Sequence, residues 1–267
     1  MITTRIGIIG LVIAAVSSSP AIGATLFETN FEPPVYTTGP FIGQDAWFAA
    51  LGGNAASVST ELAHSPTQSV RIDGTMLEPL DGFNFGSYAR PLSFDPVGSG
   101  LPIVTVSGWV NLMCDLFCPT CGTGLGLTGL GDALPNALIG IQVDGSGHLT
   151  PYLSNADASA VFGPTYILGQ WAELTAVFNY QSRTVTGFVN GVLMGEVFFT
   201  TGASSQITFL NMSLGSSVPG PGLIAYNDDF LVTAAAVPEP STLSLACLAL
   251  LGLAISYSRL RRCGIGS

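Results

Sequence analysis

The sequence contains no lysine and few charged residues of any kind. Charged residues occupy 9% of its 267 positions, whereas about a quarter is typical of globular domains. All seven basic residues are arginine, and four of them flank two apolar segments at the ends of the chain. Between positions 25 and 236, sixteen acidic residues face only Arg71, Arg90 and Arg183, a net charge of about −13. Such a surface repels polyanions, which excludes nucleic-acid binding.

The first apolar segment has the three parts of a secretory signal peptide. Arg5 supplies a positive start, residues 6–16 form an apolar run, and residues 21–24 offer small side chains for cleavage. The run is short for a membrane span, which needs about 20 residues. We therefore predict a signal peptide over residues 1–24 that signal peptidase removes. The alternative is a retained N-terminal membrane anchor.

The second apolar segment lies near the C-terminus. If helical, its sixteen residues would extend roughly 24 Å, at about 1.5 Å per residue, and bilayer thinning and arginine snorkelling can accommodate that length. The arginines behind the segment predict a cytoplasmic C-terminus and an external domain. The motif, the apolar run and the basic end are Val237, Pro238, Glu239 and Pro240; residues 242–257; and Arg259, Arg261 and Arg262.

This order of motif, apolar helix and basic end resembles the PEP-CTERM sorting signal of Gram-negative bacteria that produce exopolysaccharide. The resemblance covers residues 237–263. It implies recognition by an exosortase, a membrane-bound, transpeptidase-like protease that cleaves near the motif. The helix would be a transient inner-membrane anchor, and the mature domain would reach the cell surface or the extracellular matrix.

The central region, residues 25–234, has the pattern of one all-β domain. Short runs of β-branched and aromatic residues alternate with Gly, Pro, Asn and Asp, and no long amphipathic helix is apparent. Asn190-Gly191 is a strong hairpin signal, because both central residues of such a turn need positive φ. So many strands on short connections indicate two packed antiparallel sheets. The predicted strands cover residues 69–73, 88–94, 103–113, 137–143, 148–153, 171–180, 184–190, 192–199, 206–214 and 223–233.

Several short motifs resemble the laminin-G/concanavalin A-like jelly roll. Residues 169–171 (Gly-Gln-Trp) and 189–193 (Val-Asn-Gly-Val-Leu) are similar to its "G-x-W" and "V-N-G" motifs. Residues 106–110 resemble an inner strand of that fold, and residues 227–232 resemble its closing strand. The resemblance implies an antiparallel two-sheet jelly-roll sandwich, to which the sequence adds an N-terminal signal helix and a C-terminal transmembrane helix.

In related jelly rolls, the first and closing strands often hold a structural Ca²⁺ between them. The matching oxygen donors here are Glu28, Asn30, Glu32, Asp228 and Asp229, and hard oxygen ligands suit calcium. Alternatively, one aspartate caps a turn and the other residues are solvated. As strand neighbours, Asp228 and Asp229 are expected to point to opposite faces. No other cofactor is expected.

Three cysteines, Cys114, Cys118 and Cys121, fall in a glycine-rich insertion. The last two have the spacing of a redox motif but lack the strand-to-helix setting of a thioredoxin. Outside the cytoplasm we expect one structural disulfide among the three, leaving one thiol available for crosslinking. His64 and His148 are expected in a loop and a turn, without a catalytic role.

Tryptophan side chains are candidates for stacking on sugar rings. Trp47 follows a Gly- and Asp-containing segment that is expected to be an exposed loop, so we predict a carbohydrate contact there. Trp109 and Trp171 occupy strand positions, and we expect both to pack in the core.

The acidic residues do not form the pattern of a glycoside hydrolase. Such enzymes need two carboxylates about 5 to 10 Å apart, and jelly-roll hydrolases often carry Glu-x-Asp-x-(x)-Glu along one strand. The sequence has no such run. We therefore expect a non-catalytic protein that binds or organises extracellular polysaccharide. The alternatives are a polysaccharide-active hydrolase or lyase with carboxylates from distant strands, and a structural or adhesive protein without affinity for sugar.

Overall fold

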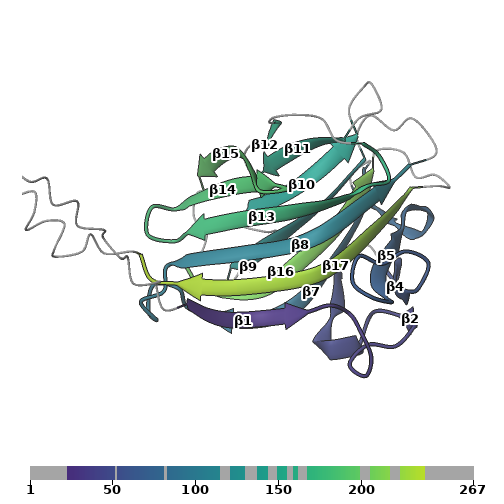
Figure 1. The fold of residues 1–267 in the computed structure, drawn as a ribbon, viewed down its shortest axis with the longest axis horizontal. Coiled ribbons are helices and arrows are strands. Elements are labelled where there is room, and N and C mark those ends of the chain that lie inside the picture. Colours follow the sequence, from purple (N-terminus) through teal and green to yellow (C-terminus); the bar gives the residue numbers. More distant parts are fainter. Residues whose placement is uncertain are drawn as a thin grey trace, which may run out of the picture. The chain divides into compact units, whose positions relative to one another are not determined.

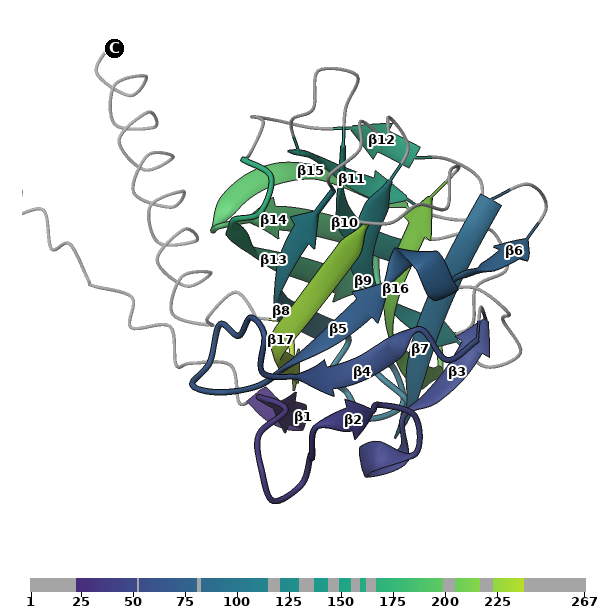
Figure 2. The ribbon, with the colours of Figure 1, turned by 90° about the vertical axis from the view of Figure 1, so that its right-hand side faces the viewer.

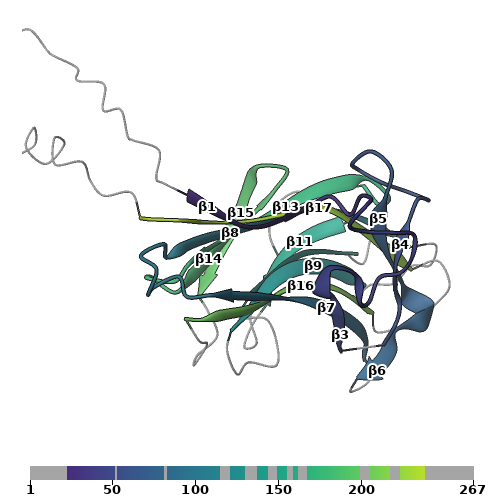
Figure 3. The same ribbon diagram turned by 90° about the horizontal axis from the view of Figure 1, so that it is seen from below.

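Two antiparallel β-sheets, sheet A and sheet B, pack against each other in the structure, which is a computed structural model (Figures 1 and 3). The predicted signal peptide lies outside the described residues except for its last two positions, and the sorting signal does so except for Val237. Among the described residues, no helix has the length and apolar character to span a membrane. The structure describes residues 23–51, 53–80, 83–114, 121–129, 137–143, 149–154, 159–161, 167–198, 205–216 and 223–237.

Sheet A has the strand order β15-β14-β13-β8-β17-β5-β4-β2, and β1 also pairs with β17. One edge of β17 is shared, because β5 pairs with its first part and β1 with the rest. The first and last strands of the domain therefore lie side by side (Figure 1). The strands are β1 (Gly23–Thr29), β2 (Gly39–Pro40), β4 (Ala56–Ser59), β5 (Ser69–Asp73), β8 (Ile103–Met113), β13 (Trp171–Asn179), β14 (Thr184–Val189), β15 (Val192–Phe198) and β17 (Ile224–Ala235).

Sheet B has the order β12-β11-β10-β9-β16-β7-β3, and β6 pairs with β7. Two 3-10 helices, η1 (Gln44–Ala46) and η2 (Gly74–Met76), lie in the connections beside β3 and β5 (Figure 2). The strands are β3 (Phe48–Leu51), β6 (Glu78–Leu80), β7 (Phe83–Phe94), β9 (Gly122–Gly129), β10 (Ala137–Val143), β11 (Leu149–Ser154), β12 (Ser159–Val161) and β16 (Ile207–Ser216).

Alternation of side chains decides which face of each strand is buried. In β13, Ala172, Leu174, Ala176 and Phe178 are buried, whereas the residues between them are partly exposed. These side chains join residues of sheet B, such as Met212, in one hydrophobic core. A two-sheet jelly roll is therefore confirmed, because each sheet has one apolar face and the two faces bury each other.

The predicted hairpin in sheet A is also confirmed. β14 and β15 pair in antiparallel register, and Asn190 and Gly191 connect them with φ values of 49° and 74°. The ten predicted strand ranges all correspond to observed strands. Their limits differ by at most two residues, except that β7 begins at Phe83, five residues before the predicted start at residue 88.

Strand β9 differs from the sequence prediction, which placed residues 114–121 and the following glycines in an insertion. Residues 122–129 form an inner strand of sheet B, between β10 and β16. Leu125 and Leu127 are fully buried in the core, and glycines alternate with them. Glycine is depleted in strands generally, so the composition concealed a strand whose leucines alone carry the apolar face.

Candidate functional site on the outer face of sheet A

The outer face of sheet A, the side turned away from sheet B, carries a group of large polar and aromatic side chains. In β8, Val106 and Val110 are buried in the core, so Ser107 and Trp109 project to the opposite side, where both are half-buried. Trp109 lies opposite Glu173 of β13 on one side and opposite Asp228 of β17 on the other. Three neighbouring strands thus contribute to one surface.

The tryptophans occupy the reverse of their predicted environments. Trp47 is only 1% exposed, and its indole Nε1 donates a hydrogen bond to the Tyr36 hydroxyl at 3.1 Å. It packs among Phe31, Phe41 and other aromatic rings, so the predicted carbohydrate contact at Trp47 is wrong. Trp109 and Trp171, expected in the core, are half-buried on the outer face. A strand position in the sequence does not by itself specify which face a side chain takes.

The 60–68 loop, which joins β4 to β5, is fastened to this face by Asp228. The Asp228 carboxylate is fully buried and accepts hydrogen bonds from the backbone N–H groups of His64 and Ser65, each at 2.9 Å. The Ser65 hydroxyl donates a third, at 3.1 Å. Burial raises the pKa of Asp228 to about 6, against the opposing effect of the backbone hydrogen bonds and with the help of the nearby Asp229 charge.

Glu32 fastens the other end of the same loop. Its carboxylate accepts hydrogen bonds from the backbone N–H groups of Thr67 at 2.7 Å and Gln68 at 2.9 Å, and from the Thr67 hydroxyl. Partial burial raises the pKa of Glu32, but these hydrogen bonds outweigh it, and the pKa is lowered overall. Both carboxylates therefore act on the backbone of the loop.

His64 links the loop to the aromatic group. Its ring stacks on the Trp109 indole, with centroids 3.8 Å apart and planes 13° apart, and meets Trp171 edge-on at 5.6 Å. Its Nδ1 lies 2.7 Å from Asp229 Oδ2. The expectation of an isolated loop histidine is therefore incomplete, whereas His148 lies outside the described residues.

Asp228 and Asp229 point to the same side of the sheet, contrary to the prediction from regular alternation. Both carboxylates contact His64. The physical reason is a bulge in β17, where pairing with β8 shifts between Asp228 and Leu231 and Asp229 adopts a φ of 50°. A bulge places an extra residue in one strand and so interrupts the alternation of faces.

Two of the five predicted calcium ligands, Glu32 and Asp228, already have hydrogen-bond partners within the protein. All four carboxylate oxygens of Glu32 and Asp228 accept hydrogen bonds from the protein. Within the described part of the chain, no three His, Cys, Asp or Glu residues form a group suited to a metal ion. The other three predicted ligands, Glu28, Asn30 and Asp229, line one cavity.

This acidic cavity has a volume of about 590 Å³ and opens on the outer face of sheet A. Carboxylates from three strands meet there, Glu28 from β1, Glu173 from β13 and Asp229 from β17. Ionised carboxylates only accept hydrogen bonds, so the cavity suits a ligand rich in donors such as hydroxyl groups. The lining residues are Glu28, Thr29, Asn30, Ser107, Glu173, Asp229, Phe230 and Leu231.

Two of the three cysteines lie in the described residues. Cys121 is disulfide-bonded, and Cys114 is half-buried. Cys118 lies outside the described residues.

Comparison with known proteins supports both the sorting signal and the fold. Residues 236–262 match the model of the PEP-CTERM protein-sorting motif. This match confirms the resemblance of the tail, and it implies an exported protein that an exosortase processes at the membrane. No curated protein matches the sequence significantly.

Solved structures share the fold at low sequence identity. An endo-1,3-beta-glucanase from Streptomyces sioyaensis is 14% identical, with a TM-score of 0.55 over 82% of this chain and 99% of that one. Lectin II from Ulex europaeus is 11% identical, with a TM-score of 0.53 over 79% of this chain and 100% of that one. A carbohydrate esterase of bacteriophage phi24B is 14% identical, with a TM-score of 0.50 over 75% of this chain and 100% of that one. The domain therefore shares the jelly-roll fold of these structures, and the chain carries a PEP-CTERM sorting motif at residues 236–262.

Proposed function

We propose that the domain binds extracellular polysaccharide without cleaving it, through the outer face of sheet A. The acidic cavity, whose lining residue Glu173 lies opposite the half-buried Trp109, carries this proposal. Binding sites for small ligands combine a concave surface, aromatic side chains and a few placed polar groups, and all three occur together here.

The charge of the cavity favours neutral sugars over acidic ones. Glu28, Glu173 and Asp229 line it, and the region between residues 25 and 236 carries about −13 overall. A polymer of uronic acids would be repelled, whereas a neutral sugar offers hydroxyl donors to the carboxylates. A neutral or sparsely charged exopolysaccharide is the ligand class that this chemistry fits.

Binding of neutral oligosaccharides by the exported domain tests the proposal. We expect Glu173→Gln to weaken affinity about tenfold, because hydrogen bonds to a charged acceptor contribute about 1.5–3 kcal/mol. Glu78→Gln is the matched control, since Glu78 is an exposed strand residue outside the cavity lining. Equal affinities for the two variants and the wild type would contradict the assignment of the cavity. Failure to bind any neutral glycan would favour an adhesive protein without sugar affinity.

A polysaccharide hydrolase or lyase is the second candidate, and the same cavity provides its support. Carboxylates from β1, β13 and β17 meet in one place, as a glycan-active enzyme on this fold would require. Release of reducing ends or of unsaturated sugars from a bound polysaccharide, abolished by Glu28→Gln or Glu173→Gln, would favour the enzyme. Binding without turnover would favour the first proposal.

We further propose that the mature domain acts at the cell surface or in the extracellular matrix. The supporting feature is the tail, in which the motif at residues 237–240 precedes the apolar segment and the arginines. Replacing Pro238 and Pro240 with alanine should leave uncleaved protein in the inner-membrane fraction. Unchanged release of that variant would argue against sorting through this motif.

A further inference from the structure

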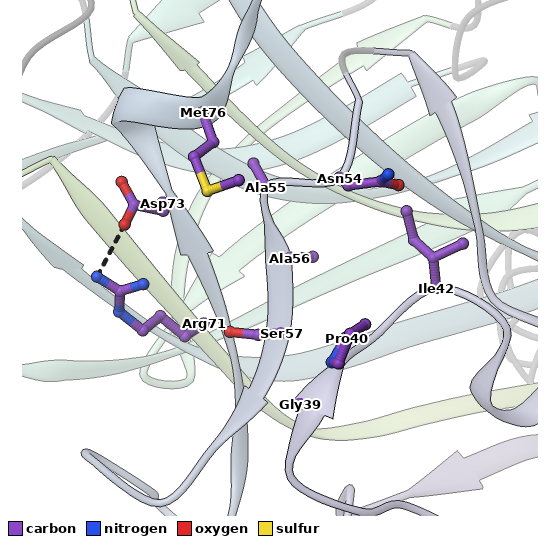
Figure 4. Close-up of a pocket in the computed structure, with 10 residues that line it drawn as sticks. All are labelled: Gly39, Pro40, Ile42, Asn54, Ala55, Ala56, Ser57, Arg71, Asp73 and Met76. Carbon is purple, nitrogen blue, oxygen red and sulfur yellow. Dashed lines mark ion pairs between the residues drawn. The ribbon is translucent and has the colours of Figure 1, made fainter.

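A second cavity, separate from the acidic one, lies on the outer side of β4 and β5 (Figure 4). Its volume is about 530 Å³, within the usual range of small-ligand pockets. Pro40, Ile42, Ala55 and Met76 form apolar walls, and Arg71 and Asp73 stand on one side (Figure 4). We call it the Arg71 pocket.

The charge of Arg71 is balanced within the protein. Its Nη2 lies 3.0 Å from Asp73 Oδ2, and its Nε lies 3.2 Å from Glu61 Oε2. The Tyr226 hydroxyl donates a hydrogen bond to the same Glu61 oxygen at 3.0 Å. Two carboxylates beside one guanidinium leave no excess positive charge for an anionic ligand. The pocket therefore favours a neutral group that can exchange hydrogen bonds with the ion pair.

The apolar walls of the pocket favour an apolar group in the ligand. Met76 is 57% exposed, although it belongs to a pocket wall. Ile42 is partly exposed and packs on the edge of the core. A small apolar group placed between them would bury this surface, and each buried methylene-sized group contributes about 0.8 kcal/mol. The ligand must then combine a small apolar group with a polar atom beside it.

The Arg71 pocket and the aromatic group lie on the same face of sheet A. Register places Ser57, Arg71, Tyr226, Asn111 and Trp171 in one row across β4, β5, β17, β8 and β13. Four strand spacings of about 4.8 Å separate the ends of this row, roughly 19 Å in all. An extended oligosaccharide can cover such a distance, so one polymer can contact both regions.

The 60–68 loop connects the two regions physically. Glu61 near its start contacts Arg71, and His64 in its middle stacks on Trp109. Asp228 and Glu32 hold the backbone of the loop in place. The two regions are therefore held in a fixed relation to each other, which suits simultaneous contact with one ligand.

We propose that the Arg71 pocket binds the acetyl group of an acetylated neutral sugar in the same polysaccharide. The acetyl methyl group would lie between Ile42 and Met76, and its carbonyl oxygen would accept a hydrogen bond from Arg71. The inference rests on the proposed function and specifies its ligand class as an acetylated polymer.

Saturation-transfer difference NMR with partially O-acetylated glucomannan oligosaccharides tests this inference on the exported domain. We expect the acetyl methyl protons to receive the strongest saturation, because they would contact the side chains of Ile42 and Met76 directly. We also expect chemically deacetylated oligosaccharides of the same length to bind about tenfold more weakly, since a small apolar group in a matching pocket contributes about that factor or more. Equal affinity of the two probes, or saturation of the methyl protons no greater than that of the ring protons, would overturn the assignment.

Two variants locate the effect within the molecule. Met76→Glu places a charge on the exposed wall of the pocket, and it should remove the preference for the acetylated probe. Val35→Glu is its matched control, because Val35 is 60% exposed and lies outside the pocket lining. If Met76→Glu retains the preference, the pocket is not the acetyl site.

The two proposals fail in different ways. If Glu173→Gln weakens binding of both probes, polysaccharide binding at the acidic cavity is supported. If the acetylated and deacetylated probes then bind equally well, the acetyl assignment of the Arg71 pocket is wrong. Absence of binding by either probe would remove both.

Discussion

The outer faces of the two sheets differ in what they present. On sheet A, large side chains such as Trp109 and Glu173 reach the surface, and Glu173 lines the acidic cavity. On sheet B, Gly124, Gly126 and Ser213 lie on the outer side of the inner strands β9 and β16 and are buried. The large side chains on that side are aromatic and pack on their neighbours, as Tyr152 does over Gly140 and Phe48 does against Phe209. The outer face of sheet A thus gathers carboxylates beside a cavity, whereas the outer face of sheet B combines small side chains with packed aromatic rings.

The largest effect is expected on sheet B, at Gly140. A Cβ atom there would collide with the Thr123 carbonyl oxygen and lie 2.5 Å from Tyr152 Cζ. Gly140→Val should therefore lower the free energy of unfolding by about 3 kcal/mol or prevent folding. Thr105→Val on the outer face of sheet A is the matched control, with an expected change within about 0.5 kcal/mol. Urea denaturation measures the free energy of unfolding of both variants. Similar decreases in the two variants would show that the outer faces of the two sheets are equally tolerant of substitution.

A smaller effect is expected from Asp228, beneath the 60–68 loop. Its pKa is raised from 3.8 to about 6 in the folded protein, so its stabilising contribution is present below pH 3.8 and is lost as pH rises through 6. The stabilising contribution of Glu32, whose pKa is lowered, is fully present above its usual 4.5 and is lost only as pH falls below that value, outside this window. Between pH 5 and 7, the wild-type melting temperature should therefore fall by a few degrees more than that of Asp228→Asn.

Thermal melts of the two proteins at matched ionic strength measure this difference. If the melting temperatures of the two proteins change equally between pH 5 and 7, Asp228 does not titrate in that range. This result would contradict its burial beneath the loop.

The smallest effect concerns the indole of Trp109 under His64. His64→Ala should expose one ring face, raise quenching of tryptophan fluorescence by acrylamide, and lower stability by about 1 kcal/mol, the usual contribution of an aromatic pair. His64→Phe is the control, because it keeps the stacked ring and loses only the contact with Asp229. If quenching rises equally in both variants, stacking at 3.8 Å does not protect the indole.

Strands with alternating β-branched residues could be read directly from the sequence. The predicted limits of residues 69–73 and 103–113 coincide with β5 and β8, because one face of each strand is continuously apolar. Strand β9 was missed, since glycines fill its other face and leave only Leu125 and Leu127 as a signal. Composition therefore predicts strands with many apolar side chains in the core. It overlooks a glycine-rich strand such as β9, which is recognised only from its pairing with neighbouring strands.

The site was less predictable, because it depends on contacts between distant parts of the chain. His64 and Asp229 are 165 residues apart, and no spacing rule connects them. The acids at Glu32 and Asp228 were recognised as important, but their partners turned out to be backbone N–H groups of the 60–68 loop. A carboxylate reads the same in sequence whether it binds a cation or fixes a loop. Only the fold distinguishes the two.

Pairing between the first and last strands has a mechanical consequence. Gly23 of β1 lies opposite Ala235 at the end of β17, and β17 is also paired along its length with β8. Tension applied through the tail along the axis of β17 would load its inter-strand hydrogen bonds together, in shear, rather than peel them apart one at a time. A domain loaded in this way would resist pulling along that strand better than pulling across it.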